Sequence, residues 1–260
     1  NITPDHLDRY SSFSDYISSK LSIYKYCQFS TVNMDLDLAN DVDGDNYYGI
    51  ELNNSRCDFV AKKNGSTYEV FHKGISLITS NDLVVVGKHN IENLLAALTL
   101  GYRFGLSLKV MTQAAIDFKG LEHRLEFIST RNNVDYYNDS KSTNAISTKT
   151  AINALFEKYN NLTLIAGGIS KKEDYSELFQ LINEKVSAVV LIGQCRNDFS
   201  KQITAPHVEV VESMKKAVSM ATSMTEGGAV LLSPGCASFD MFVDFNDRGE
   251  TFKRHVLEGI

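Results

Sequence analysis

The residues best suited to chemistry form the stretch 138–144, which reads NDSKSTN. It supplies a carboxylate, an ammonium group, hydroxyls and amides, without a large apolar side chain. Because it follows the strand-like run 134–137 and precedes a helical pattern, we expect it at the carboxyl end of a sheet, where α/β proteins bind ligands. The helix beginning there would direct free N–H groups at an anion. A polar loop that only caps the helix is the alternative, since Asp, Ser, Thr and Asn are good N-cap residues.

Three later turns, 167–172, 193–194 and 233–240, also follow short apolar strands. In a doubly wound sheet such turns converge on one edge. There, fixed N–H donors and ammonium groups would replace the hydration of a small molecule that carries carboxylates or phosphates. The interpretation as a ligand site depends on the occurrence of all these turns at successive strand ends, and not on any one of them. With the first stretch they contribute these cationic and hydroxyl side chains: Lys141, Thr143, Lys171, Lys172 and Ser238.

Two candidates lie near the start of the chain. His6, in the charged cluster 5–9, could bind a divalent cation or form surface ion pairs. Lys20 lies among the apolar positions of a helical stripe over residues 13–25. Long lysine side chains often reach solvent from such positions, so a structural role is the alternative for Lys20. The Asp-rich segment 35–45 lacks the ligand spacing of a calcium loop, which favours a solvated loop.

Three further polar residues are candidates, and the last of them lies close to a presumed domain boundary near Lys119. Asn90 and Asn93 open a predicted helix and could bind a ligand or cap that helix. Arg124 falls just after the boundary, where an arginine can reach a phosphate.

The pattern from residue 120 onward alternates short apolar strands with helices, and glycine often follows the strands. This order predicts an α/β domain over 120–260 with a parallel, doubly wound sheet covered on both faces. Residues 26–86 instead contain short alternating runs, the last at 83–86, which predict antiparallel hairpin strands. One helix is expected between Gly87 and Gly105, and a second at about 107–118. The expected domains are therefore 1–119 and 120–260.

Composition limits the classes of partner. The 260 residues carry a formal net charge of −6, whereas binding nucleic acid requires clustered Lys and Arg, so nucleic acid is not expected as the main partner. No apolar run approaches the ~20 residues that span a bilayer, and no membrane role is expected. The four cysteines show neither a CxxC pair nor metal-ligand spacing, which indicates reduced thiols in a cytoplasmic protein.

The sequence resembles the Mur ligase family, the ATP-dependent amide-forming enzymes of bacterial cell-wall synthesis. Within the family it is most similar to the members that add D-glutamate. This resemblance implies an incomplete central ATPase-type domain followed by a Rossmann-like domain. The matching stretches occur in the family's order at residues 1–9, 87–93, 120–126, 138–144, 231–240 and 248–252.

The resemblance also implies the substrates and the reaction. A carboxylate of UDP-N-acetylmuramoyl-L-alanine would attack the γ-phosphate of ATP, and the amine of D-glutamate would then attack the acyl phosphate. Phosphoryl transfer depends mainly on positioning and charge neutralisation, which suits a site rich in cations and Mg²⁺. A monomer is expected.

The roles of individual residues follow from the resemblance alone. His6 matches a magnesium ligand, and Lys20 matches a lysine whose carbamylated form holds a second magnesium ion. Asn90 and Asn93 match positions near the nucleotide, with Asn93 at the adenine. Arg124, Asp139 and Lys141 match groups around the ATP phosphates and ribose. The D-glutamate pocket is matched by Thr143, Lys171, Ser238 and Phe245.

The chain departs from the family in three ways. It contains no Gly-x-x-x-x-Gly-Lys-[Ser/Thr] loop for the ATP phosphates, it lacks the domain that would hold the uridine nucleotide, and Ile169 replaces an acidic residue of some relatives. We therefore expect the carboxyl-terminal part of a ligase, inactive alone. The alternatives are a ligase for another amino acid, such as a folylpolyglutamate-type enzyme, and a non-catalytic module that binds a nucleotide or an amino acid.

Overall fold

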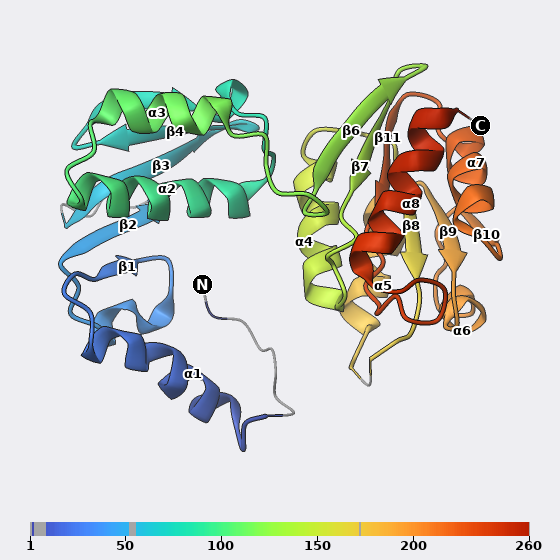
Figure 1. Ribbon diagram of the computed structural model, residues 1–260, viewed down its shortest axis with the longest axis horizontal. Coiled ribbons are helices and arrows are strands. Elements are labelled where there is room, and N and C mark those ends of the chain that lie inside the picture. The colour runs from blue at the N-terminus through green and yellow to red at the C-terminus, as the bar shows by residue number, and fades with distance from the viewer. Residues whose placement is uncertain (1, 3–8, 52–55, 172, 260) are drawn as a thin grey trace. The chain divides into compact units, whose positions relative to one another are not determined.

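The computed structural model describes residues 2, 9–51, 56–171 and 173–259, and side chains 40 and 41 are also outside the description. The chain forms two compact units (Figure 1). Unit 1 comprises residues 1–84 and 88–118, and unit 2 comprises residues 85–87 and 119–260. None of the described helices is long and apolar enough to cross a membrane.

Unit 1 contains a five-stranded sheet and three α-helices among its described residues. The sheet has the order β1 (Thr31–Asn33), β2 (Asn46–Ile50), β3 (Cys57–Asn64), β4 (Thr67–His72) and β5 (Ile75–Thr79). The helices are α1 (Phe13–Leu21), α2 (Lys88–Arg103) and α3 (Leu108–Asp117). Apolar residues of α2 and of β2 to β5 share one core, because alternate strand residues face these helices.

The prediction of antiparallel hairpins is right for only part of this sheet. Strands β3, β4 and β5 pair antiparallel, but β1, β2 and β3 are parallel. The connection from β1 to β2 contains a 3-10 helix, Asp37–Asp41, and returns the chain to the starting end of β1. The strand expected at 83–86 is also wrong. The strand before it is β5, and the capping box of Thr79 and Asp82 turns the chain out of the sheet there.

The acidic segment 35–45 binds backbone groups. The Asp35 carboxylate accepts hydrogen bonds from the Ile50 N–H at 2.9 and 3.0 Å, and burial raises the pKa of Asp35. Asp45 accepts from the N–H and hydroxyl of Ser30 at 2.7 and 2.9 Å. Across the described part of the chain, no group of three or more His, Cys, Asp or Glu residues is arranged to hold a metal ion. These aspartates therefore fasten the loop to the sheet.

Unit 2 contains a six-stranded sheet of the order β10-β9-β8-β11-β7-β6. All neighbouring pairs are parallel except β6 with β7, which is antiparallel. The prediction of a doubly wound α/β domain is confirmed, and β6 is an additional edge strand. The strands are β6 (Glu126–Arg131), β7 (Val134–Asn138), β8 (Leu162–Gly167), β9 (Ala188–Ile192), β10 (His207–Val210) and β11 (Gly228–Leu232).

Helices cover both faces of this sheet (Figure 1). One core contains Leu162 and Leu164 of β8, and the other contains Ile165 of the same strand. All three side chains are fully buried, as expected for a strand with helices on both sides. The first face carries α4 (Ala145–Phe156), α5 (Ser176–Lys185) and α6 (Arg196–Ser200), and the second carries α7 (Met214–Met224) and α8 (Phe245–Glu258).

Candidate active site

The turns that follow β7, β8, β9 and β11 are hydrogen-bonded to one another at one edge of unit 2. The Gly235 N–H donates to the Ser142 carbonyl at 3.0 Å, which joins the turns after β11 and β7. Ile169 and Ala237 exchange two backbone hydrogen bonds of 2.9 and 3.0 Å, which join the turns after β8 and β11. The Gln194 N–H donates to Asp240 at 2.7 Å. The structure thus brings together the turns that the strand order predicts to converge.

The turn 138–144 directs most of its polar side chains inward. Asn138, Asp139, Ser140 and Ser142 are buried, whereas Lys141 is exposed. The turn also caps α4, because the Asn144 side chain accepts from the Ser147 N–H at 2.8 Å. Capping is therefore one real function of this stretch, and the buried groups form a second, internal network.

Asp139 is the centre of that network. Its carboxylate accepts from the Leu125 N–H at 3.1 Å, from the Ser233 hydroxyl at 2.8 Å and from the Ser142 hydroxyl. Burial raises the pKa of Asp139 to about 6, against the opposing effect of these hydrogen bonds. Both carboxylate oxygens therefore accept hydrogen bonds that hold the conformation of the turn.

Arg248 of α8 is a buried residue that sequence reasoning did not single out. Only 1% of the residue is exposed. Its Nε and Nη2 donate to the hydroxyl and carbonyl of Ser140 at 2.9 and 2.8 Å, and its Nη1 donates to the Cys236 carbonyl at 3.0 Å. Burial lowers the pKa of Arg248 to about 10. The guanidinium therefore ties the turns after β7 and β11 together through neutral oxygens, and its positive charge lies directly behind them.

Exposed cations lie in front of these turns. The Lys141 ammonium stands 3.7 Å from the centroid of the Phe245 ring, and Lys171 Nζ lies 3.5 Å from the Thr143 hydroxyl. Phe245 and Thr143 are half-buried, and Ser238 is buried at 2% exposure. The candidate Lys172 lies outside the described residues. The structure thus places two ammonium groups, a hydroxyl and an aromatic ring at one edge, where an anionic ligand has access.

The turn after β8 is shaped by its backbone. Gly168 has a φ of +137°, and a Cβ there would lie 2.2 Å from the Ala237 carbonyl oxygen. Glycine is therefore required for the bridge between Ile169 and Ala237. Tyr175, also missed from sequence, supports the same turn: its hydroxyl accepts from the Lys171 N–H at 3.2 Å and donates to the Gly235 carbonyl at 3.1 Å. Burial raises the pKa of Tyr175, which keeps the hydroxyl protonated as a donor.

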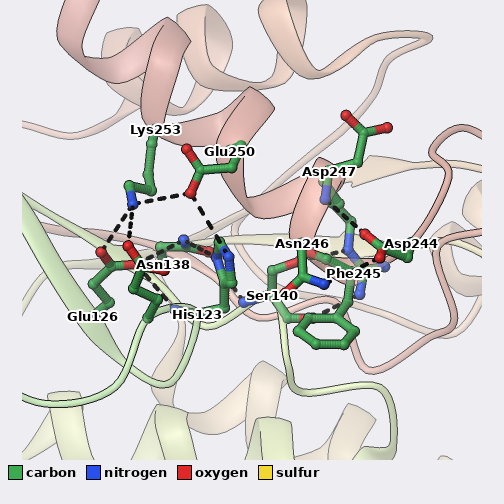
Figure 2. A network of polar contacts seen from close by, with 12 residues as sticks. His123, Glu126, Asn138, Ser140, Asp244, Phe245, Asn246, Asp247, Glu250 and Lys253 are labelled. Atoms are coloured by element: carbon green, nitrogen blue, oxygen red, sulfur yellow. Dashed lines mark hydrogen bonds and ion pairs between the residues drawn. The ribbon is translucent and has the colours of Figure 1, made fainter.

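The loop before β6 carries Arg124, whose side chain is exposed. His123 beside it is buried and lies 2.9 Å, Nδ1 to Nδ2, from Asn138 (Figure 2). Glu126 accepts from the His123 N–H and from Asn138 Nδ2, both at 3.0 Å. Arg124 is therefore presented by a loop that is fastened to the turn 138–144.

The candidate residues of unit 1 that the structure describes are exposed or half-buried. Lys20 is exposed on α1, with Nζ 5.3 Å from the Tyr16 ring centroid, and it lines a cavity of about 250 Å³ together with Thr31 and Asn33. The snorkelling alternative is consistent with this exposure. An unmodified ammonium group does not bind Mg²⁺, so only the carbamylated form of Lys20 would fit a metal. His6 lies outside the described residues.

Asn90 and Asn93 lie within α2. The helix begins at Lys88, so Asn93 is in its second turn and the capping alternative is wrong for that residue. Asn93 is exposed, and Asn90 is half-buried.

Comparisons with known proteins agree with this architecture. The Mur ligase middle domain matches residues 1–101, and the Mur ligase glutamate ligase domain matches residues 123–236. The UDP-N-acetylmuramoylalanine–D-glutamate ligase of Marinobacter nauticus is 38% identical over 267 residues, covering 100% of this chain. The ligase of the same name from Caldicellulosiruptor saccharolyticus is 36% identical over 276 residues, covering 99%. The chain spans 59% of the length of each relative.

Solved structures show the same fold at lower sequence identity. A crystal structure of MurF from Acinetobacter baumannii superposes with a TM-score of 0.74 at 15% identity, covering 100% of this chain and 59% of that one. Folylpolyglutamate synthase from Thermotoga maritima gives a TM-score of 0.52 at 20% identity, covering 72% and 45%. Because both matched domains occur in order along the sequence and the relatives align over nearly its whole length, the chain belongs to the Mur ligase family.

Proposed function

We propose that the protein carrying these residues is an ATP-dependent ligase of the cytoplasm that joins D-glutamate to UDP-N-acetylmuramoyl-L-alanine. The relatives from Marinobacter nauticus and Caldicellulosiruptor saccharolyticus are UDP-N-acetylmuramoylalanine–D-glutamate ligases, which supports this substrate pair. The observation that carries the proposal in the structure is the cationic edge of unit 2, where Lys171 lies beside Thr143 and Lys141 lies over Phe245. Such an edge suits an amino acid with two carboxylates.

The pocket residues divide the work of binding D-glutamate. Lys171 and Thr143 would bind one carboxylate, and Ser238 with neighbouring backbone N–H groups would bind the other. The buried charge of Arg248, whose described hydrogen bonds run to neutral oxygens, adds a fixed positive potential behind both. This arrangement would hold the substrate while its amine, once neutral, attacks an activated carbonyl carbon.

Each unit has its own candidate residues for binding the nucleotide. We assign Arg124 and Lys141 to the phosphates, and Asn90 and Asn93 to the surroundings of the base. ATP supplies the phosphoryl group that activates the acceptor carboxylate. Since the carboxylate of Asp139 bonds to the turn itself, its contribution would be to orient that turn, with Arg124 and Lys141 on either side.

In the full-length protein, His6 and carbamylated Lys20 are the proposed magnesium ligands. The missing phosphate-binding loop is proposed to lie elsewhere in the full-length protein. The 260 residues alone are expected to be inactive.

The direct test measures phosphate release by the full-length protein with ATP and UDP-N-acetylmuramoyl-L-alanine. We expect release to depend on D-glutamate, and L-glutamate, meso-diaminopimelate and L-lysine to support little of it. Preference for another amino acid, or for a folate acceptor, would replace the proposal with a related ligase. ATP or amino-acid binding without turnover would favour the non-catalytic module.

Lys20→Ala tests the assignment of unit 1. Loss of a carbamate that holds a metal should lower the turnover of the full-length protein roughly 100-fold. Short carboxylic acids should restore part of the rate, because they replace the lost carboxylate-like group. Lys25→Ala is the matched control, since Lys25 is exposed in the following helical turn and does not line the cavity. Normal turnover in Lys20→Ala would remove Lys20 from the mechanism.

A further inference from the structure

Arg124 is flanked by two residues with strained backbone conformations. His123 has a φ of +62° and Leu125 a φ of +47°, a region that non-glycine residues rarely adopt. The other non-glycine residues of unit 2 described in this region are Asn132 and Asn133, in the tight turn between β6 and β7. Asparagine and histidine adopt this region several-fold more often than other non-glycine residues, whereas leucine rarely does. The left-handed backbone costs on the order of 1–2 kcal/mol per residue, and contacts elsewhere must offset this cost, above all at Leu125.

Two carboxylates hold the strained backbone, one on each side of Arg124. Glu126 Oε2 accepts from the His123 N–H at 3.0 Å, and Asp139 Oδ1 accepts from the Leu125 N–H at 3.1 Å. The His123 carbonyl in turn accepts from the Lys141 N–H at 3.0 Å. The backbone on either side of Arg124 is therefore fixed by acceptors from β6 and from the turn 138–144.

Lys253 of α8 forms an ion pair with the first of these carboxylates (Figure 2). It also lies 3.6 Å from a carboxylate oxygen of Glu122 in the same loop. Its Nζ lies 3.2 Å from Glu126 Oε1 and 3.0 Å from Glu250 Oε1. Each oxygen of Glu126 thus has a separate role, one facing Lys253 and one facing the His123 N–H. The side chains of Lys253 and Glu126 are both only 18% exposed, so solvent screens this pair less than an ordinary surface pair. Although burial opposes it, hydrogen bonds to Glu250 and Glu126 raise the pKa of Lys253.

Helix α8 also contacts the loop through the His123 ring. A Cβ at Gly249 would lie 2.2 Å from His123 Nδ1, so the absence of a side chain at Gly249 lets the ring lie against the helix. His123 Nε2 is 3.7 Å from Glu250 Oε1. The helix therefore holds the loop at two places, through the ring of His123 and through the carboxylate of Glu126.

We propose that Lys253 and Glu126 are positioning residues that keep the segment 123–125 strained and thereby fix the direction of Arg124 toward the nucleotide phosphates. The inference rests on the proposed function, because it requires Arg124 to contact the nucleotide. Backbone strain persists only where surrounding contacts over-determine it, and here those contacts converge on the segment that carries one exposed guanidinium. A bound phosphate then meets an arginine whose backbone is already fixed, so less conformational freedom is lost on binding.

The test measures initial rates of the full-length protein in Lys253→Met, which keeps most of the apolar side chain and removes its charge. We expect the KM for ATP to rise roughly three- to tenfold, the equivalent of one ion pair, while the KM for D-glutamate changes less than about twofold. Lys253→Arg should restore most of the ATP affinity. Glu126→Gln should act in the same direction as Lys253→Met. Lys201→Met is the matched control, because Lys201 pairs with Asp198 on the exposed surface of α6.

A double-mutant cycle separates positioning from general destabilisation. In an Arg124→Ala background, Lys253→Met should cause no further change in the KM for ATP, because the group being positioned is gone. Deuterium uptake by a peptide spanning 119–126 should be faster in Lys253→Met than in the wild-type protein. An unchanged KM for ATP in Lys253→Met, equal increases for both substrates, or additive effects in the cycle would each overturn the inference.

Failure of the inference is distinguishable from failure of the proposed function. If the wild-type protein shows no D-glutamate-dependent turnover, or if Arg124→Ala leaves the KM for ATP unchanged, the proposed function or its assignment of Arg124 is wrong. If Arg124→Ala raises that KM but Lys253→Met and Glu126→Gln do not, only the positioning role is wrong.

Discussion

Two turns at the same edge of unit 2 are built in different ways. The turn 138–144 after β7 is held by side chains, since Asp139 and Ser142 bond to each other inside the protein and Ser140 bonds to Arg248. The turn 167–171 after β8 is held mainly by its backbone, through Gly168 and the bridge from Ile169 to Ala237. Strands β7 and β8 both pair with β11, so these two designs lie on either side of one strand.

This difference implies that the first turn contributes mainly to the stability of the fold and the second mainly to ligand binding. In the first turn a polar side chain is part of the protein interior, and replacing it leaves buried groups without partners. In the second turn the backbone sets the shape, so an exposed side chain such as Lys171 is free to serve a ligand. Substitutions in and behind the first turn should therefore alter unfolding, whereas substitutions of the outward groups should alter substrate binding alone.

Arg248→Met should have the largest effect on stability. It removes three charge-assisted hydrogen bonds and leaves the carbonyls of Ser140 and Cys236 without these donors in the interior. We expect a loss of about 4 kcal/mol in the free energy of unfolding, measured by urea denaturation. Arg254→Met is the matched control, because Arg254 is exposed on the same helix. Equal stability of the two variants would show that the turn after β7 does not depend on buried side chains.

Asp139→Asn should have the next largest effect, because it removes a pH dependence of the free energy of unfolding. The folded pKa of Asp139, about 6, lies above the unfolded value near 3.8, so between these pH values the folded state binds more protons than the unfolded state. Stability should therefore fall as pH rises through this window, by up to about 3 kcal/mol, and Asp139→Asn should lack that loss. Urea midpoints at pH 4 and pH 7 measure the difference. Parallel pH profiles for the wild type and the variant would contradict it, and exposed Asp198→Asn serves as the control.

The architecture of unit 2 could be predicted because its central strands β8, β9 and β11 are short and almost wholly apolar, a pattern typical of a sheet covered on both faces. Edge strand β6 could not, since its residues alternate irregularly between half-buried and exposed. In unit 1, the antiparallel prediction is right for β3 to β5 but wrong for the pairing of β1, β2 and β3. The direction of that pairing depends on how the segment between β1 and β2 crosses the sheet, which the composition of the strands does not encode.

The location of the candidate site could be predicted from the sequence, but the orientation of its side chains could not. The composition of 138–144 indicated a polar turn at a strand end, yet it did not indicate that Asp139 faces inward while Lys141 faces outward. Arg248 was missed because an arginine on an amphipathic helix is usually exposed. Its burial depends on Ser140 and Cys236, which are distant in sequence, so no local pattern marks it.

Lys171→Ala should have the smallest effect on stability and still impair function, which makes it the sharpest test of the comparison. Lys171 is exposed, and its described side-chain contact is the 3.5 Å approach to Thr143, so the free energy of unfolding should change by less than about 0.5 kcal/mol. Under the proposed function, the KM of the full-length protein for D-glutamate should rise about tenfold, the equivalent of one charge-assisted hydrogen bond to a carboxylate, with the KM for ATP nearly unchanged. Steady-state kinetics and urea denaturation of the same preparation measure both quantities, with exposed Lys215→Ala as the control. A stability loss like that of Arg248→Met would mean that the second turn also depends on its side chains, and an unchanged D-glutamate requirement would remove Lys171 from the pocket.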